Sequence, residues 1–133
     1  MKCSIIYYSA RKTSYCEKAL KKSFADCGLN LSDAAFAASA EALGTEIIRA
    51  FAKTDVVFTV GGLEFTDSRS VRDIISHAAK DSEPSLCRKL RNESGDDGYL
   101  LRAGRQLLVM LPDEPEQIEA MMSGTPAAYI KSM

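Results

Sequence analysis

The sequence predicts a three-layer α/β/α domain built on a mixed, mostly parallel β-sheet with a β-hairpin late in the chain. Short apolar, β-branched segments alternate with segments of helical periodicity, which is typical of helices packed on both faces of a sheet. The apolar segment 55–60 stops at Gly61 and Gly62, as a buried strand does where it turns toward a helix. Residues 99–111 hold two apolar runs around a short turn, the pattern of a hairpin. A chain of 133 residues is long enough for one hydrophobic core, and we expect a single domain over residues 1–133.

The first two elements are a strand and an amphipathic helix. Residues 3–8 are apolar and β-prone, and Thr13 or Ser14 can cap the helix that follows, with Ser14 and Glu17 at capping-box spacing. Gly28 stands where a left-handed residue ends a helix. The predicted core face of this helix comprises Cys16, Ala19, Leu20, Phe24 and Cys27. A weak strand is expected at residues 29–31, before a small-residue segment.

The middle of the chain predicts a helix, the central strand and another helix. An apolar stripe favours a helix over residues 40–53, although Gly44 costs about 1 kcal/mol relative to alanine and leaves a later start at Thr45 open. The strand at 55–60 follows, and then a helix from about Ser70. The core face expected for that helix is Val71, Ile74, Ile75 and Ala78. Pro84 suits the first turn of a short helix carrying Leu86 and Leu90.

The last third of the chain predicts a loop, the hairpin and a final helix. Residues 92–98 are polar and glycine-rich, and the hairpin strands are expected at 99–102 and 106–111. Asp113, three residues before Glu116, has N-cap spacing for a final helix that contains Ile118, Met121 and Met122. Residues 124–133 are expected to be a short tail.

Composition excludes several classes of function. The formal net charge is −1, so no basic surplus favours nucleic acid or an anionic membrane as partner. The apolar runs are far shorter than a membrane span, and the first residues resemble a strand rather than a secretory signal, so we expect a cytoplasmic protein. The four cysteines form no C-x-x-C pair and there is one histidine, His77. We therefore expect reduced, packed thiols and no structural zinc.

The turn after the central strand is the best place for a ligand. In parallel α/β sheets ligands bind at the carboxyl ends of strands, and glycines let an anion approach the main chain. Thr66 and Ser68 can donate to a phosphate at the following helix start, or can simply cap that helix. Glu64 and Asp67 can hold a divalent cation at a phosphate, or be two solvated acids.

Three segments together resemble the molybdopterin-binding domain shared by molybdenum-cofactor biosynthesis proteins and the N-terminal part of CinA-type proteins. Residues 55–63, DVVFTVGGL, are similar to the family's strand and double-glycine signature. Asn92, Gly95 and residues 98–101 resemble an N-x-x-G stretch of the CinA-type branch, and residues 107–115 resemble the strand and P-G-x-P signature that precede a helix. The match runs in order over about residues 40–122.

The resemblance implies a mixed-sheet α/β fold, often trimeric, that binds a pterin or nucleotide phosphate at the glycine turn. A homo-oligomer, a trimer by resemblance, is therefore expected. Molybdopterin or a related phosphorylated ligand is the expected cofactor, with a divalent cation as an optional companion. The residues expected at the ligand are Ser9, Gly61, Gly62, Leu63, Thr66, Ser68 and Asp113.

The chain departs from the family pattern at the motifs themselves. Glu64 stands where the family has a glycine, Phe65 replaces a proline, and Asp113 replaces the glycine of P-G-x-P. The first strand ends in residues 9–11, Ser-Ala-Arg, instead of Gly-Asp-Glu. A carboxylate about 5 Å from a phosphate repels it by roughly 3 kcal/mol at an effective dielectric of about 20, unless a cation such as Arg11 offsets the charge.

We therefore hypothesise a degenerate or remodelled site in a protein linked to molybdenum-cofactor biosynthesis, with no catalytic residues. Two alternatives stay open. Residues 5–14 resemble the first phosphate loop of flavodoxins, which would make the protein an FMN-binding electron carrier. The other alternative is a non-catalytic interaction domain that retains the fold but binds no small molecule.

Overall fold

The structure is a computed structural model that describes residues 1–65, 67, 69–70 and 86–133. Its helices and strands, in chain order, are β1 (Lys2–Tyr8), α1 (Thr13–Cys27), β2 (Asn30–Ala37), α2 (Ala40–Lys53), β3 (Val56–Val60), β4 (Leu86–Leu90), β5 (Gly98–Ala103), β6 (Gln106–Leu111), α4 (Pro115–Met122) and α5 (Thr125–Lys131).

The described strands form one mixed sheet in the order β2-β1-β3-β6-β5-β4. The pairs β2–β1, β1–β3 and β3–β6 are parallel, whereas β6–β5 and β5–β4 are antiparallel. The predicted hairpin is confirmed as β5 and β6, with Gly104 in the turn at φ +60°. The carboxyl ends of β1, β3 and β6 therefore lie side by side at one edge of the sheet.

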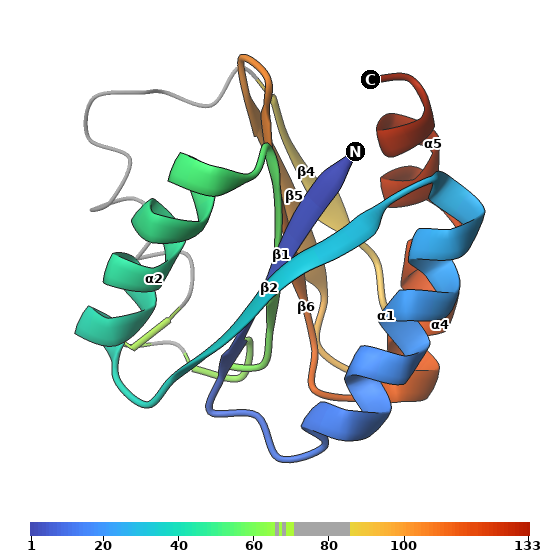
Figure 1. Ribbon diagram of the computed structural model, residues 1–133. Helices are drawn as coiled ribbons and strands as arrows, with labels where there is room; N and C mark the ends of the chain where they lie inside the picture. The colour runs from blue at the N-terminus through green and yellow to red at the C-terminus, as the bar shows by residue number, and fades with distance from the viewer. Residues whose placement is uncertain (66, 68, 71–85) are drawn as a thin grey trace.

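Helices cover both faces of this sheet, which confirms the predicted three-layer α/β/α fold. Figure 1 shows α2 on one face and α1, α4 and α5 on the other. The alternation of side chains along each strand divides the core accordingly. Ile5 packs in the cluster on the α1 side and its neighbour Ile6 in the cluster on the α2 side, and both are buried.

Helix α1 ends as predicted but begins differently. Gly28 takes the left-handed conformation at φ +74°, and its N–H donates to the Phe24 carbonyl. The N-cap is Lys12, and no side chain of that residue caps the helix, so the prediction of a cap at Thr13 or Ser14 is wrong. Asp113, far away in the sequence, instead accepts from the N–H groups of Arg11 and Lys12, just before the helix.

Helix α2 begins at Ala40 and includes Gly44, so the alternative start at Thr45 is wrong. The hydroxyl of Ser39 accepts from the N–H of Ala42 at 3.1 Å, which fixes the first turn. This N-cap and the buried Leu43, Ile47 and Ala50 outweigh the propensity cost of one glycine.

Two predicted segments have a different secondary structure. Residues 86–90 form strand β4 rather than part of a short helix, because pairing with β5 supplies their backbone hydrogen bonds. Strand β2 spans eight residues, Asn30–Ala37, rather than three, and its alternating exposure is that of an edge strand. The expected tail contains helix α5, which buries Ile130 against the core.

Some expectations lie outside the described residues. These are the helix from Ser70 with its core face at Val71, Ile74, Ile75 and Ala78, together with His77, Thr66 and Ser68.

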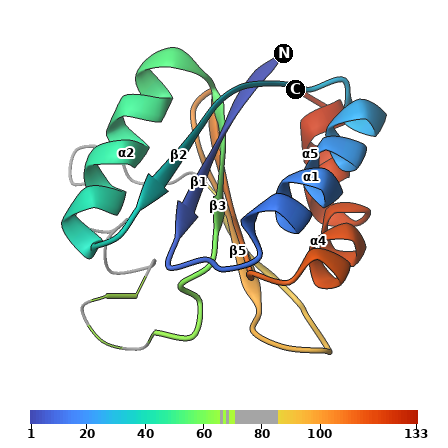
Figure 2. The same ribbon diagram turned by 60° about the horizontal axis from the view of Figure 1, so that its bottom comes forward.

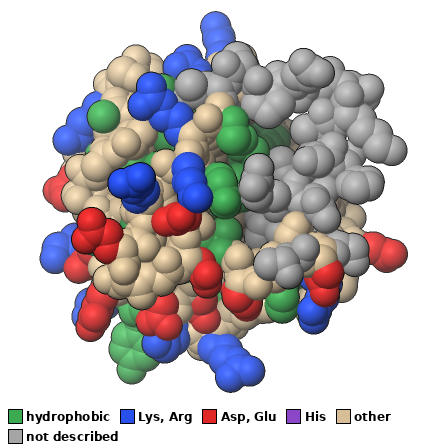
Figure 3. Space-filling model, turned by 180° about the vertical axis from the view of Figure 1, so that it is seen from behind, with side chains coloured by type: hydrophobic (Ala, Val, Ile, Leu, Met, Phe, Trp, Pro, Cys, Tyr) green, Lys and Arg blue, Asp and Glu red, His purple; other side chains and the backbone are tan. Residues whose placement is uncertain are grey.

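The surface carries both signs of charge. Acidic and basic side chains are both spread over the face seen in Figure 3, in keeping with the formal net charge of −1. Among the helices that the structure describes, none is long and apolar enough to cross a membrane.

Candidate functional site at the carboxyl edge of the sheet

The candidate site is built from the segments that follow the three central parallel strands. These segments are residues 9–12 after β1, 61–65 after β3, and 112–114 after β6. The end of the molecule that carries them is turned forward in Figure 2. The Gly61 N–H donates to the Leu111 carbonyl at 2.9 Å, so the turn after β3 is fastened directly to the end of β6.

Gly61 and Gly62 form a turn that requires glycine. Their φ angles are +97° and +79°, in the region that side chains disfavour. A Cβ on Gly61 would lie 2.3 Å from the Tyr8 carbonyl oxygen and 3.3 Å from the Ala10 Cβ. The tight turn predicted from the sequence is confirmed, and it packs directly against the end of β1.

Some backbone N–H groups of this turn donate hydrogen bonds to described residues, and others have no acceptor among them. Gly61 donates to Leu111, and Phe65 donates to the Gly62 carbonyl at 3.3 Å. The N–H groups of Gly62 and Leu63 find no acceptor among the residues that the structure describes. Gly62 is itself buried, and a buried N–H without a partner is costly. Among the described residues, these two are therefore the backbone donors of the turn that have no partner.

Ser9 begins the segment after β1 that lies beside the glycine turn. It lies directly after β1 and has φ +49°, a left-handed value that is uncommon for a residue other than glycine. Its neighbour Ala10 is the residue whose Cβ approaches the Gly61 turn. Ser9 thus bends the chain so that residues 10–12 pass beside the glycines on their way into α1.

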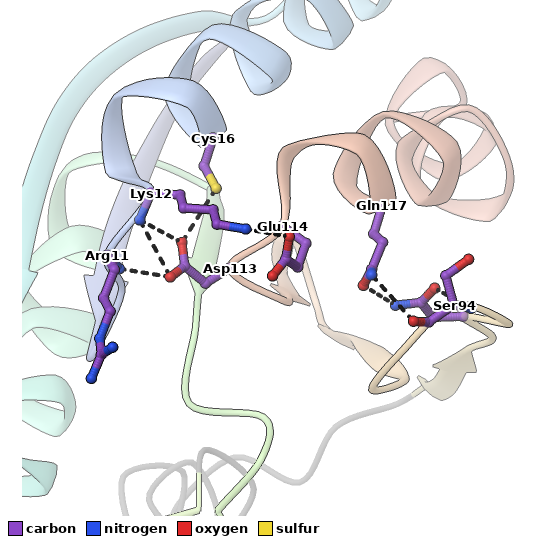
Figure 4. Close-up of polar contacts among 8 residues, drawn as sticks. Arg11, Lys12, Cys16, Ser94, Asp113, Glu114 and Gln117 are labelled. Atoms are coloured by element: carbon purple, nitrogen blue, oxygen red, sulfur yellow. Dashed lines mark hydrogen bonds and ion pairs between the residues drawn. The ribbon is translucent and has the colours of Figure 1, made fainter.

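Asp113 has a role that the sequence did not predict. Its carboxylate accepts from the backbone N–H of Arg11 at 2.6 Å and from that of Lys12 at 3.1 Å (Figure 4). The N-cap of α4 is Glu114, and that helix has no side-chain cap, so the expected capping of the last helix by Asp113 is wrong. The carboxylate serves the unpaired N–H groups before α1 instead, where the helix dipole also favours negative charge.

The thiol of Cys16 completes the Asp113 cluster. Its Sγ donates to Asp113 Oδ1 at 3.4 Å, and the residue is fully buried. Burial, followed by the hydrogen bond to the carboxylate, raises the pKa of Cys16 to about 12. The thiol is therefore neutral and unreactive at ordinary pH, as expected for a packed cysteine. All four cysteines are free, but Cys87 is exposed, so the expectation of packing is wrong for that residue.

In the segment after the glycines, the acid Asp67 is paired with the nearby Arg69. Asp67 and Arg69 form an ion pair at 2.8 Å, and the hydrogen bonds from Arg69 lower the pKa of Asp67 to about 2. The Arg69 guanidinium lies 4.4 Å from the centre of the Phe65 ring, and the Tyr8 hydroxyl donates to the Arg69 carbonyl at 2.8 Å. Asp67 is thus paired with Arg69, which offsets part of the repulsion expected at a phosphate.

The Asn92 and Gly95 motif holds a loop against helix α4. The Asn92 amide donates to Gln117 Oε1 at 2.6 Å, and Gln117 Nε2 donates to the Ser94 carbonyl at 3.3 Å. A Cβ on Gly95 would lie 2.8 Å from Gln117 Oε1. In the described structure this motif therefore anchors the loop to α4. The sequence did not predict the part that Gln117 plays, because no local pattern links it to residues 92–95.

The structure brings five of the seven expected ligand residues to one edge. Thr66 and Ser68 lie outside the described residues. The five residues are Ser9, Gly61, Gly62, Leu63 and Asp113. Within the described ranges, no group of three or more His, Cys, Asp or Glu side chains is placed to hold a metal ion.

A separate cavity of about 500 Å³ lies between helices α1, α4 and α5. It involves the end of α1, where Lys22 and Glu119 form a 3.5 Å ion pair. Because α1 runs back along the parallel strands, the end of this helix is remote from the glycine turn. The cavity is therefore no part of the site at the carboxyl edge.

Comparison with known proteins identifies the fold. No family model and no curated protein matches the chain. Among solved structures, CinA from Thermoplasma acidophilum is similar over 97% of both chains, with a TM-score of 0.78 and 16% identity. The molybdopterin biosynthesis Mog protein from Mycobacterium ulcerans is similar over 98% of this chain and 97% of its own, with a TM-score of 0.70 and 17% identity.

The molybdopterin biosynthesis enzyme MoaB from Thermus thermophilus has a TM-score of 0.64 and 15% identity over 99% of this chain and 97% of its own. The chain thus has the fold of CinA and of the molybdopterin biosynthesis proteins MoaB and Mog over nearly its whole length, as the resemblance in sequence indicated.

The flavodoxin-like alternative is not favoured. In that reading the turn after β1 would cradle the phosphate of FMN. The N–H groups of Arg11 and Lys12 in this turn already bind the Asp113 carboxylate, which leaves them no capacity for a phosphate.

Proposed function

We propose that this protein binds molybdopterin or a related phosphorylated pterin or nucleotide at the carboxyl edge of its sheet. It would serve molybdenum-cofactor biosynthesis without being an enzyme. The observation that carries the proposal is the pair of backbone donors at Gly62 and Leu63, which have no acceptor among the described residues. Phosphate is a suitable acceptor for such donors at a strand end.

The likeness in fold supports the choice of ligand. Solved structures with this fold include proteins named for molybdopterin biosynthesis. We extend this to the present chain with a remodelled site, in which Ser9 and Asp113 shape the edge, and in which Thr66 and Ser68 complete the ligand contacts. A divalent cation that accompanies the phosphate belongs to the same proposal.

The remodelling is the reason to propose binding without catalysis. Asp113 is occupied by the start of α1, and Asp67 is paired with Arg69. Among the described residues at this edge, these two acids are therefore engaged in structural contacts. Glu114 is paired with Lys12, and Glu64 is exposed beside the turn, where it weakens rather than assists the binding of an anion.

Calorimetric titration of the full chain with molybdopterin, ADP-ribose and ATP tests the proposal. Adenosine serves as the unphosphorylated control, and each titration is run with and without Mg²⁺. We expect saturable binding of at least one phosphorylated ligand and a matching rise in melting temperature, since a ligand of the native state stabilises it by mass action. Incubation with ATP or ADP-ribose should give no product above background.

The possible outcomes separate the alternatives. Turnover above background would overturn the proposal of a non-catalytic site. Absence of binding and of thermal stabilisation with every ligand would favour the interaction-domain alternative instead. We further propose a cytoplasmic homo-oligomer, a trimer by resemblance; light scattering coupled to size-exclusion chromatography should then give three times the mass of the chain.

A further inference from the structure

We infer that Arg11 binds the terminal phosphate of the ligand and makes the site selective for phosphomonoesters. The inference rests on the proposed function and names the class of ligand that the same site takes. It follows from where the backbone of Arg11 is held and from which charges at this edge are already paired.

The backbone of Arg11 is fixed beside the glycine turn. Its N–H donates to Asp113 Oδ2 at 2.6 Å. The preceding residue, Ala10, has its Cβ only 3.3 Å from the position that a Cβ on Gly61 would take. The Arg11 side chain therefore starts one residue from the closest approach between the end of β1 and the turn that carries the unused donors.

The other two described cations of this edge, Lys12 and Arg69, already have partners. Lys12 Nζ lies 2.8 Å from Glu114 Oε2, and Arg69 lies 2.8 Å from Asp67 Oδ2. The Arg11 guanidinium has no acidic partner within the part of the chain that the structure describes.

Asp113 fixes the position of the Arg11 backbone but does not neutralise the charge of the Arg11 side chain. The carboxylate accepts from the N–H groups of residues 11 and 12 and from the thiol of Cys16. In Figure 4 the side chain of Arg11 runs away from Asp113 and from Lys12. Asp113 thus fixes the backbone of Arg11 beside the turn, and the Arg11 side chain has no acidic partner among the described residues.

The chemistry of a guanidinium selects the ligand class. It is charged at all ordinary pH values, and its planar array of N–H donors matches two oxygens of a phosphate. A terminal phosphomonoester carries more negative charge and more free phosphate oxygens than a diester. An unphosphorylated pterin or nucleoside has no phosphate for the guanidinium to bind. In this proposal the positive charge of Arg11 also opposes the effect of Glu64, an exposed acid in the segment after the glycines.

The test uses Arg11→Ala and Arg11→Lys in the full chain, titrated with molybdopterin, AMP and adenosine. Arg105→Ala is the matched control, because Arg105 is also exposed but lies in the β5–β6 turn at the opposite end of the sheet. We expect Arg11→Ala to weaken binding of the phosphorylated ligand by about 10- to 100-fold. Arg11→Lys should lose less, and Arg105→Ala should bind like the parent protein.

The outcomes distinguish this inference from the proposed function. If the parent protein binds molybdopterin or AMP and Arg11→Ala binds equally well, the role of Arg11 is overturned and the proposed function stands. Equal losses in Arg11→Ala and Arg105→Ala would mean a general effect of charge and would also overturn it. If the parent protein binds neither molybdopterin nor AMP, the inference about Arg11 fails, and the proposed function fails with it only if ATP and ADP-ribose do not bind either. Unchanged melting temperatures of the variants exclude a folding defect as the cause.

Discussion

Two neighbouring segments at the carboxyl edge of the sheet, the one before α1 and the glycine turn after β3, differ in whether their backbone N–H groups have acceptors. At the start of α1, the carboxylate of Asp113 takes the N–H groups of Arg11 and Lys12, so the protein supplies its own anion. At the end of β3, the N–H groups of Gly62 and Leu63 are left without an acceptor among the described residues. A strand end at a carboxyl edge is therefore not by itself a ligand site, because what matters is which donors the fold has left unpaired.

Replacing Gly61 by alanine should have the largest effect, because it disrupts the packing of the glycine turn against the end of β1. The new Cβ would meet the Tyr8 carbonyl oxygen at 2.3 Å, and φ at this position is +97°. The obstacle is backbone, which cannot rotate aside, so we expect a loss of about 3 kcal/mol or more in the free energy of unfolding. Urea denaturation followed by circular dichroism measures it.

Gly104→Ala is the matched control for that variant. Gly104 also has a positive φ, +60°, but nothing lies within 4 Å of its Cβ position. Its replacement should cost only about 1 kcal/mol, from backbone strain alone. Equal losses at the two positions would contradict the close contact between the turn and the end of β1.

Removing the carboxylate of Asp113 has the next largest expected effect. Asp113→Ala leaves the N–H groups of Arg11 and Lys12 and the Cys16 thiol without their acceptor. We expect a loss of about 2–3 kcal/mol in the free energy of unfolding, measured by urea denaturation. Glu114→Ala removes only the half-exposed ion pair with Lys12 and should cost less than about 0.5 kcal/mol.

The thiol of Cys16 reports on the same contact. In the parent protein the raised pKa and the burial of Cys16 should make its alkylation by iodoacetamide far slower than that of the exposed Cys87. Asp113→Ala should speed the labelling of Cys16 while leaving Cys87 unchanged, which mass spectrometry of the labelled peptides can resolve. Unchanged stability and unchanged labelling would show that Asp113 does not hold the start of α1.

The features predicted correctly are those encoded by neighbouring residues. The β-branched run before Gly61 and the left-handed Gly28 are local signals, and both were read correctly from the sequence. The partners of Asp113 could not be predicted in this way, because they lie 101 and 102 residues away in the chain. Strand β4 was mistaken for a helix for the same reason, since its hydrogen bonds come from β5 and not from its own sequence.

Replacing Gly95, in the loop that Asn92 holds, should have a much smaller effect than replacing Gly61 or Asp113. A Cβ on Gly95 would meet Gln117 Oε1 at 2.8 Å, but this atom ends a flexible side chain that can move aside. We expect Gly95→Ala to cost about 0.5–1 kcal/mol in the free energy of unfolding and to leave ligand affinity unchanged. In a Gln117→Ala background the obstacle is gone, so the same substitution should be nearly neutral, a coupling that a double-mutant cycle measures directly. A cost that stays the same in both backgrounds would mean that a neighbour other than Gln117, such as the Asn92 amide at 3.4 Å, limits the space at Gly95. The anchoring of the loop through Gln117 would then not explain why a glycine stands there.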